Sequence, residues 1–148
     1  MVKYYNIFDV PVTDNDIYSF DIETSSLFCI NGKWVSFDKN YDKEFYTKVK
    51  KGALCYLWAF AVNDKVFYGR KIEEFKDILE YLKSDNKRII WVHHLSFEFQ
   101  FILNITTNIK VFSRKAHKII KCFLPEYNIE FRCTYMLSNT SLEALGET

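Results

Sequence analysis

Residues 18–26 read Tyr-Ser-Phe-Asp-Ile-Glu-Thr-Ser-Ser, a stretch in which two carboxylates interrupt an apolar run. The apolar run at 17–22 favours a buried strand, and the Thr and Ser residues at 24–26 favour a turn that leaves the strand end open to solvent. Side chains alternate along a strand, so Asp21 and Glu23 are predicted to project from one face. Two carboxylates on one face repel each other unless a hard cation such as Mg²⁺ or Mn²⁺ lies between them. Two solvated acids on an edge strand would have the same spacing.

A second segment, Trp-Val-His-His-Leu-Ser-Phe-Glu-Phe-Gln-Phe at residues 91–101, combines a strand end with the start of a helix. The pattern predicts a strand over 88–92 and a helix to about residue 104 with Ser96 as its N-cap. Glu98 then lies in the first helical turn, at the end of the sheet where another strand end can lie nearby. Stabilisation by the helix dipole is the alternative explanation of this acid.

The two adjacent histidines at this strand end, His93 and His94, are predicted to point in opposite directions. They are therefore poorly placed to chelate one ion. One is expected to be packed or hydrogen-bonded, and the other to line the cleft. The only other histidine is His117, and no cysteine lies near the pair, which argues against a zinc site.

The rest of the chain alternates between strand-like and helix-like segments, which indicates an α/β fold with a mixed sheet and flanking helices. A helix is predicted over 72–82, where apolar residues recur at helical spacing. Residues 38–51 are interpreted as a long loop. A capping-box pattern at 140–143 indicates the start of a further helix. Further strands are predicted at 54–62 and 65–68, joined by a turn at Asn63-Asp64, and at 109–112, 119–124 and 128–133.

Composition limits the classes of protein that the chain can represent. Its 148 residues, 49% of them hydrophobic, suit a single domain over 1–148 with a real core. The net charge of +1 argues against general polyanion binding, so any contact with DNA has to be local. The four cysteines form no Cys-x-x-Cys pair, and there is no signal peptide or long apolar span. We therefore expect a cytoplasmic protein with free thiols and no membrane partner.

The two acidic segments together resemble the exonuclease motifs of family B DNA polymerases. Residues 20–25 resemble the first motif, usually written Asp-x-Glu, and residues 92–101 resemble the second. The similarity is greatest to the protein-primed polymerases of phages and linear plasmids. Residues 129–137 resemble the segment that follows in those proteins. The resemblance extends from about residue 17 to the end of the chain.

This resemblance implies a ribonuclease H-like fold of the proofreading-exonuclease type. It also implies hydrolysis of single-stranded DNA 3′ ends with two Mg²⁺ or Mn²⁺ ions. Asp21 would bridge both ions, Glu23 would hold one and orient the attacking water, and Glu98 would bind the other. If the chain is phage-encoded, its location would be the host cytoplasm. The residues implied in holding the terminal nucleotides are Thr24, Ser25, His94 and Phe97.

The sequence departs from the family pattern at three points. His94 stands where Asn is common, and Glu98 where many members have Asp. The third motif, Tyr-x-x-x-Asp, is missing, because Tyr135 is followed at that spacing by Asn139. The chain also ends where a helix is predicted to begin. We therefore expect an exonuclease-like domain that is incomplete at its C-terminus.

Two hypotheses about function follow. The first is an exonuclease that forms part of a phage-like DNA polymerase, with the remainder of that polymerase as a partner. The second is a catalytically degenerate relative that binds nucleic acid, or that inhibits a polymerase, a nuclease or a host defence protein. The missing third motif favours the second hypothesis. The retained acids Asp21, Glu23 and Glu98 favour the first, because binding alone does not require three like charges at one site.

Overall fold

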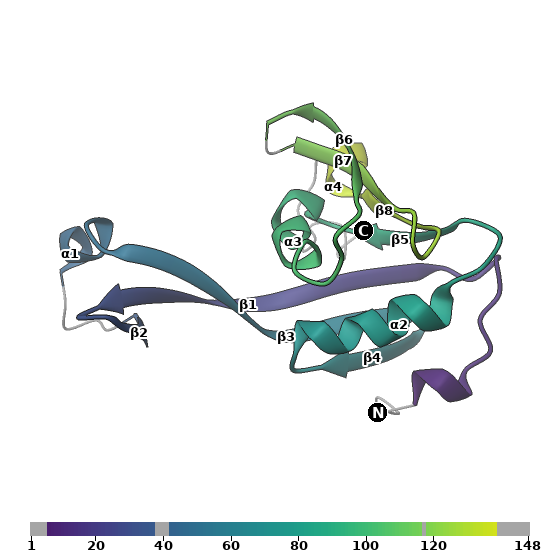
Figure 1. Cartoon of the computed structure of the whole chain (residues 1–148), viewed down its shortest axis with the longest axis horizontal. Helices are drawn as coiled ribbons and strands as arrows, with labels where there is room; N and C mark the ends of the chain where they lie inside the picture. The colour runs from purple at the N-terminus through teal and green to yellow at the C-terminus, as the bar shows by residue number, and fades with distance from the viewer. Residues whose placement is uncertain (1–5, 38–41, 117, 139–148) are drawn as a thin grey trace.

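The computed structural model describes residues 6–37, 42–116 and 118–138, and its largest feature is one eight-stranded sheet (Figure 1). The strands run in the order β4-β3-β1-β5-β8-β7-β6, and β2 pairs with β1 off this path. Their bounds are β1 Tyr18–Ile30, β2 Lys33–Ser36, β3 Lys50–Val62, β4 Lys65–Gly69, β5 Arg88–Val92, β6 Lys110–Lys115, β7 Lys118–Leu124 and β8 Ile129–Cys133.

Parallel and antiparallel pairs have separate places in the sheet. β5 lies between β1 and β8 and is parallel to both. The remaining pairs, β1–β3, β3–β4, β1–β2, β7–β8 and β6–β7, are antiparallel. The predicted α/β class with a mixed sheet is therefore confirmed, and most of the pairing is antiparallel. This arrangement is compatible with a ribonuclease H-like fold.

The hydrophobic core forms where the helix α2 (Phe75–Leu82) covers one face of the sheet. The short 3-10 helix η2 (Ile72–Glu74) leads into α2, and together they match the helix predicted over 72–82. Phe75 is fully buried and stacks on Phe20 of β1, with 4.2 Å between ring centroids. Burial alternates along β1 from Tyr18 to Glu23, so Phe20 faces the core while Asp21 and Glu23 are exposed on the other face.

A second helix, α3 (Leu95–Ile102), follows β5 directly and packs against β7 and β8. Three short helices complete the described structure: η1 (Ile7–Asp9), α1 (Lys43–Thr47) and α4 (Tyr135–Ser138). None of the described helices is long and apolar enough to cross a membrane. The four cysteines are free, as expected.

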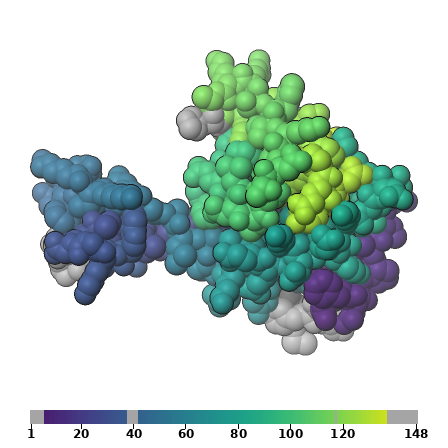
Figure 2. All heavy atoms as spheres, in the orientation of Figure 1, coloured from purple at the N-terminus to yellow at the C-terminus, as the bar shows by residue number. Residues whose placement is uncertain are grey.

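The outer halves of β1 and β3 extend away from the rest of the molecule and carry β2 and α1 at their far end (Figures 1 and 2). We call residues 24–37 and 42–56 the arm, and the remaining described residues the body. The arm has a small aromatic cluster of its own around Tyr46, which is 4% exposed. The Tyr46 ring lies 4.4 Å from Phe28 and 4.8 Å from Phe37, measured between centroids.

The arm corrects two predictions made from the sequence. Residues 24–26 are not a turn, because they continue β1 and pair with residues 53–55 of β3 after a register shift at Glu23/Thr24. The proposed loop at 38–51 contains α1 and the start of β3, although residues 38–41 lie outside the described structure. The helix predicted from 140 also lies outside it. The other predicted strands are present, with bounds that differ by a few residues.

Candidate functional site

The end of β5 leaves an edge of β1 open, and this opening brings the two acidic segments together. β5 pairs with β1 only at Tyr18 and Ser19 and ends at Val92, whereas β1 continues to Ile30. The chain turns at His93 and His94 and enters α3, whose first turn carries Glu98. Parallel neighbouring strands place Asp21 beside this turn, because it lies two residues beyond the Ser19–Trp91 pair.

Glu98 is buried, with 3% of its surface exposed, and it lies beside Asp21. Burial is the main cause that raises the pKa of Glu98 to about 8, and the neighbouring charge of Asp21 raises it further. The hydrogen bond from the backbone N–H of Glu98 lowers this pKa, but by less than burial raises it. Among the described residues, Glu98 Oε2 has no hydrogen-bond partner.

Glu130 on β8 is equally buried, and it provides an internal comparison for Glu98. Arg132 Nε donates to Glu130 Oε2 at 2.6 Å, and the ammonium groups of Lys87 and Lys121 lie 3.7 and 3.9 Å from Oε1. Glu130 is therefore neutralised by three cations, as buried acids usually are. Glu98 has no ion pair with any residue in the described structure. In place of a counter-charge, burial raises the pKa of Glu98 and favours its protonated, neutral form.

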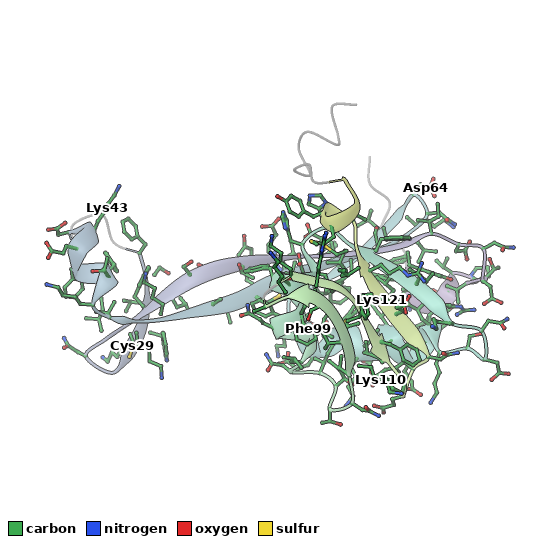
Figure 3. The ribbon with its side chains drawn as sticks, turned by 90° about the horizontal axis from the view of Figure 1, so that it is seen from above. Cys29, Lys43, Asp64, Phe99, Lys110 and Lys121 are labelled. Carbon is green, nitrogen blue, oxygen red and sulfur yellow. The ribbon has the colours of Figure 1, made fainter. Side chains whose placement is uncertain are left out.

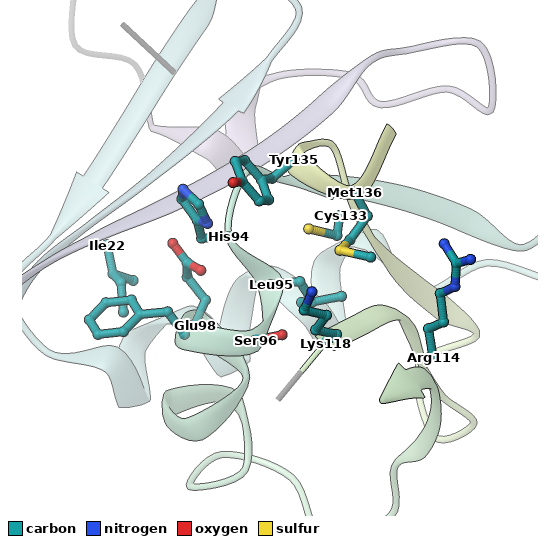
Figure 4. A pocket seen from close by; sticks show the side chains of 11 residues that line it. Ile22, His94, Leu95, Ser96, Glu98, Arg114, Lys118, Cys133, Tyr135 and Met136 are labelled. Atoms are coloured by element: carbon teal, nitrogen blue, oxygen red, sulfur yellow. The ribbon is translucent and has the colours of Figure 1, made fainter. Parts of the chain in front are cut away.

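An open cleft of about 800 Å³ lies over Glu98 (Figure 4). His94 and Tyr135 stand beside Glu98, with the two rings 4.5 Å apart. Phe97 lines the same cleft and is 42% exposed. The prediction that one histidine lines a cleft is therefore confirmed for His94. The residues lining the cleft are Ile22, His94, Leu95, Ser96, Phe97, Glu98, Arg114, Lys118, Cys133, Tyr135 and Met136.

His93 takes the other role predicted for the histidine pair. It is 9% exposed, and its Nδ1 lies 2.8 Å from Thr134 Oγ1. With Asp21 and Trp91 it lines a second, smaller cavity of about 450 Å³. His93 Nε2 is buried and has no partner among the residues described. Asp21 thus borders the smaller cavity, and Glu98 borders the larger one.

The predicted metal ligands are only partly assembled. Asp21 and Glu98 lie together, and Glu23 projects from the same face of β1 as Asp21. However, no three His, Cys, Asp or Glu side chains in residues 6–37, 42–116 and 118–138 are grouped closely enough to hold a metal ion. Carboxylate oxygens are the ligands that hard cations such as Mg²⁺ or Mn²⁺ prefer, and such a cation would supply the counter-charge that the described residues do not give to Glu98. A third protein ligand is not supplied by the described residues.

Two of the four residues predicted to hold nucleotides are not among the residues that line the cleft. Thr24 and Ser25 are half-buried in the arm strand, where they pair with Cys55 and Leu54 of β3. Their Thr and Ser composition favours a turn, but the long antiparallel partner β3 continues the strand through them instead. Ser96, predicted as the N-cap of α3, instead accepts a hydrogen bond from Ile119 N at 2.8 Å, and His94 occupies the cap position.

Arg114 and Lys118 line the cleft and were not predicted from the sequence. The signal was present in the run Ser-Arg-Lys-Ala-His-Lys at 113–118, which contains three cations and no acid. It was overlooked because the nearly balanced net charge of the whole chain conceals a local excess. Tyr135 also lines the cleft, although sequence analysis considered it only as the start of an incomplete third motif.

Comparison with solved structures identifies a fold relative. The chain is similar to Phi29 DNA polymerase, in a ternary complex with primer–template DNA and incoming nucleotide substrates. The TM-score is 0.52 with 10% sequence identity, over 81% of this chain and 20% of the polymerase chain. The match thus spans about one fifth of that polymerase, and at this identity it shows the fold alone. No protein-family model matches the chain, and no curated protein matches its sequence.

Proposed function

We propose that this chain is a ribonuclease H-like, proofreading-type 3′→5′ exonuclease domain that hydrolyses single-stranded DNA ends with Mg²⁺ or Mn²⁺. The observation that carries the proposal is the burial of Glu98 beside Asp21 without a cation. Leaving an acid of raised pKa in a cleft is costly for a fold, whereas it is useful for binding a divalent ion. The fold shared with part of a DNA polymerase supports nucleic acid as the substrate class.

In this proposal Asp21 and Glu98 hold the metal ions, and Glu23 adds a carboxylate from the same face of β1. Divalent ions bound there would stabilise the negative charge that develops on the phosphate oxygens during hydrolysis. The exposed rings of Phe97 and His94 would stack against the terminal bases and keep the 3′ end over the carboxylates. As a fragment of a phage-like polymerase, the domain would act on frayed 3′ ends produced by that enzyme.

A second candidate function is favoured by the absence of a third grouped ligand in the described part of the chain. A degenerate relative with two paired carboxylates would bind nucleic acid, or inhibit a polymerase, nuclease or defence protein, without hydrolysing DNA. The two candidates predict different metal responses. An exonuclease requires the divalent ion for turnover, whereas a binding protein retains its ligand in a chelator.

The deciding experiment follows shortening of a single-stranded DNA that carries a fluorophore at its 5′ end. With Mn²⁺, the chain is expected to produce a ladder that shortens from the 3′ end. The Asp21→Asn and Glu98→Gln variants should each reduce the rate by about 100-fold or more, because each removes a metal-binding carboxylate. The Glu73→Gln variant is the matched control, since Glu73 is an exposed acid on η2, outside the cleft.

Direct metal binding gives a readout that does not depend on turnover. Mn²⁺ titration followed by calorimetry should show binding to the native chain that Glu98→Gln weakens and Glu73→Gln leaves unchanged. If Mn²⁺ binds but no ladder appears with the chain alone, the second candidate function replaces the first. If Mn²⁺ does not bind at all, the metal assignment of Asp21 and Glu98 is wrong.

A further inference from the structure

Positive charge is concentrated in one stretch of this nearly neutral chain. Residues 99–125 contain no Asp or Glu but contain five cations, Lys110, Arg114, Lys115, Lys118 and Lys121. Outside this stretch, acidic residues outnumber basic ones. All five cations lie on the hairpin formed by β6 and β7. An excess of this kind on one element is the electrostatic signature of a polyanion-binding surface.

The hairpin is placed where a polyanion could reach it. β6 is the last strand of the sheet and pairs only with β7, and all six of its residues are exposed. In the space-filling view, the hairpin projects from the body above the rest of the surface (Figure 2). Its basic side chains are therefore available to a ligand, apart from Lys121, which lies 3.9 Å from Glu130.

Two of these cations connect the hairpin to the cleft. Arg114 and Lys118 line the same cleft as Glu98, and the close-up shows them across it from that carboxylate (Figure 4). No ion pair joins either of them to an acidic residue within the described structure. The β6–β7 ladder is irregular here, because Ser113 pairs with Ile119 and Lys115 with Lys118, which leaves Arg114 outside the regular pairing. Bulges of this kind commonly redirect a side chain near a functional site.

An aromatic ring accompanies the charges along the hairpin. Phe112 is 59% exposed and pairs across the ladder with Lys121, whose ammonium lies 5.6 Å from the ring centroid. A solvent-exposed ring beside a cation suits a single-stranded nucleic acid, in which bases are free to stack while phosphates contact the cations. An acidic protein would match the charges but would have no need of an exposed ring.

The arm is the other lysine-rich surface, and it fits a polynucleotide less well. Its five described lysines are accompanied by two acids, Asp42 and Glu44, and Lys48 pairs with Glu44 at 3.4 Å. In the view from above, Cys29 and Lys43 of the arm are at the opposite end of the molecule from Lys110 and Lys121 of the hairpin (Figure 3). The arm is therefore poorly placed to guide a strand towards Glu98.

We propose that the β6–β7 hairpin is a track that binds the backbone of single-stranded nucleic acid, with Arg114 and Lys118 contacting the phosphates nearest to the cleft. The track extends the proposed function and rests on it in one respect: the end of the bound nucleic acid is taken to lie at Glu98. Binding by the hairpin itself requires neither metal nor hydrolysis.

The test measures binding of a fluorescent oligothymidylate by anisotropy in a chelator, so that no turnover occurs. The double variant Arg114→Gln/Lys118→Gln should bind about tenfold or more weakly at low salt. The slope of log affinity against log salt should fall by about 1.4, because two phosphate contacts are lost on a single strand. Two matched controls, Arg70→Gln/Lys76→Gln and the arm variant Lys50→Gln/Lys51→Gln, should retain both affinity and slope.

Each outcome separates the track from the catalytic proposal. If the hairpin variant loses affinity and the chain makes no ladder in Mn²⁺, the track stands and hydrolysis is wrong. If the native chain does not bind oligothymidylate, or if the arm variant loses as much affinity as the hairpin variant, the track is wrong. Poly-glutamate that binds as tightly and with the same dependence on Arg114 and Lys118 would also overturn the assignment to nucleic acid. Circular dichroism and urea midpoints equal to those of the native chain would exclude misfolding.

Discussion

The body and the arm both place a tryptophan ring over a glycine of another strand, but with different surroundings. In the body, Trp58 of β3 lies across Gly69 of β4, is 4% exposed, and donates from Nε1 to Lys71 O at 2.8 Å. In the arm, Trp34 of β2 lies over Gly52 of β3 and is 48% exposed. In the body, where Trp58 and Gly69 are directly paired, a ring covering a cross-strand glycine is a known device for stabilising sheets.

The difference shows what each region can tolerate. A Cβ at Gly69 would overlap the indole of Trp58, which cannot move because Phe75 packs against it and its N–H is bonded. A Cβ at Gly52 would lie 3.1 Å from the Trp34 ring, which can shift into solvent. The body is therefore expected to respond to substitution as a rigid unit, whereas the arm should adjust locally.

The largest expected effect is that of Gly69→Ala. Because the added methyl group displaces a fixed, buried ring, this variant should lose about 4 kcal/mol of unfolding free energy, near the upper end for overpacking. Urea unfolding followed by tryptophan fluorescence measures the loss. Gly52→Ala is the matched control, and its unfolding free energy should stay within about 1 kcal/mol of that of the native chain. Alanine makes the unfolded chain less flexible than glycine does, and this gain offsets the cost of a small shift of Trp34. Equal losses in the two variants would show that the arm is as tightly packed as the body.

The body was the region most accessible to sequence reasoning, because its signals are local. The helical spacing of Phe75, Ile78 and Leu82 and the apolar run at 88–92 each define an element within a few residues. The arm depends instead on pairing residues 24–29 with 50–55, and nothing in the Thr and Ser residues at 24–26 indicates a partner that lies so far along the chain. Its strands were therefore interpreted as a turn and a loop.

The same limit applies to the candidate site. The same-face placement of Asp21 and Glu23 followed from strand alternation, and the proximity of Glu98 to Asp21 agrees with a carboxylate placed at the end of a strand. The sequence gives no indication that Glu98 lacks a counter-charge while Glu130 has three. The cations around Glu130 come from Lys87, Lys121 and Arg132, which only the folded sheet brings together.

Glu98 provides the second prediction, in which the body again differs from the arm. Its pKa is about 8 in the folded chain against 4.5 ordinarily, so the folded state binds the proton more tightly than the unfolded state. The unfolding free energy should therefore fall as pH rises from about 4.5 to about 8 in the presence of a chelator. Glu98→Gln should abolish this decline. At the upper pH the variant should be more stable than the native chain by about 2–3 kcal/mol. This gain is smaller than the full pKa shift would give, because water relaxes around a buried charge.

Urea unfolding at about pH 5 and about pH 8 measures this difference, since the two values bracket most of the window. The control is Glu44→Gln in the arm, where the carboxylate is 73% exposed. Its stability should follow that of the native chain at both values of pH. A Glu98→Gln variant that gains nothing at the upper pH would mean that Glu98 is already neutralised without metal.

Tyr46→Ala should disrupt the arm without unfolding the body. Removing this ring leaves Phe28 and Phe37 without their shared neighbour, and the two rings are 6.4 Å apart between centroids, farther than either is from Tyr46. Hydrogen exchange should show loss of amide protection in residues 24–30 and 50–55, while the body changes by less than about 1 kcal/mol. Tyr56→Ala, which removes an exposed ring from the same arm, should keep this protection. A cooperative loss of body protection with Tyr46→Ala would show that the two regions unfold together.

The smallest expected effect concerns thiol reactivity, which reports on the two regions without altering either. Cys122 in the body is 1% exposed, and burial raises its pKa to about 12, so it has almost no thiolate at neutral pH. Burial also raises the pKa of Cys55, whereas Cys29 is only partly buried in the arm. Modification with a thiol-reactive dye should therefore label one of the four cysteines rapidly in the folded chain and all four in urea. Cys29→Ser should remove the rapid phase. If Cys122 instead reacted as quickly as Cys29, the body would open as readily as the arm. The different responses expected for Gly69→Ala and Gly52→Ala would then reflect local packing of the two tryptophan rings rather than a difference in rigidity between the two regions.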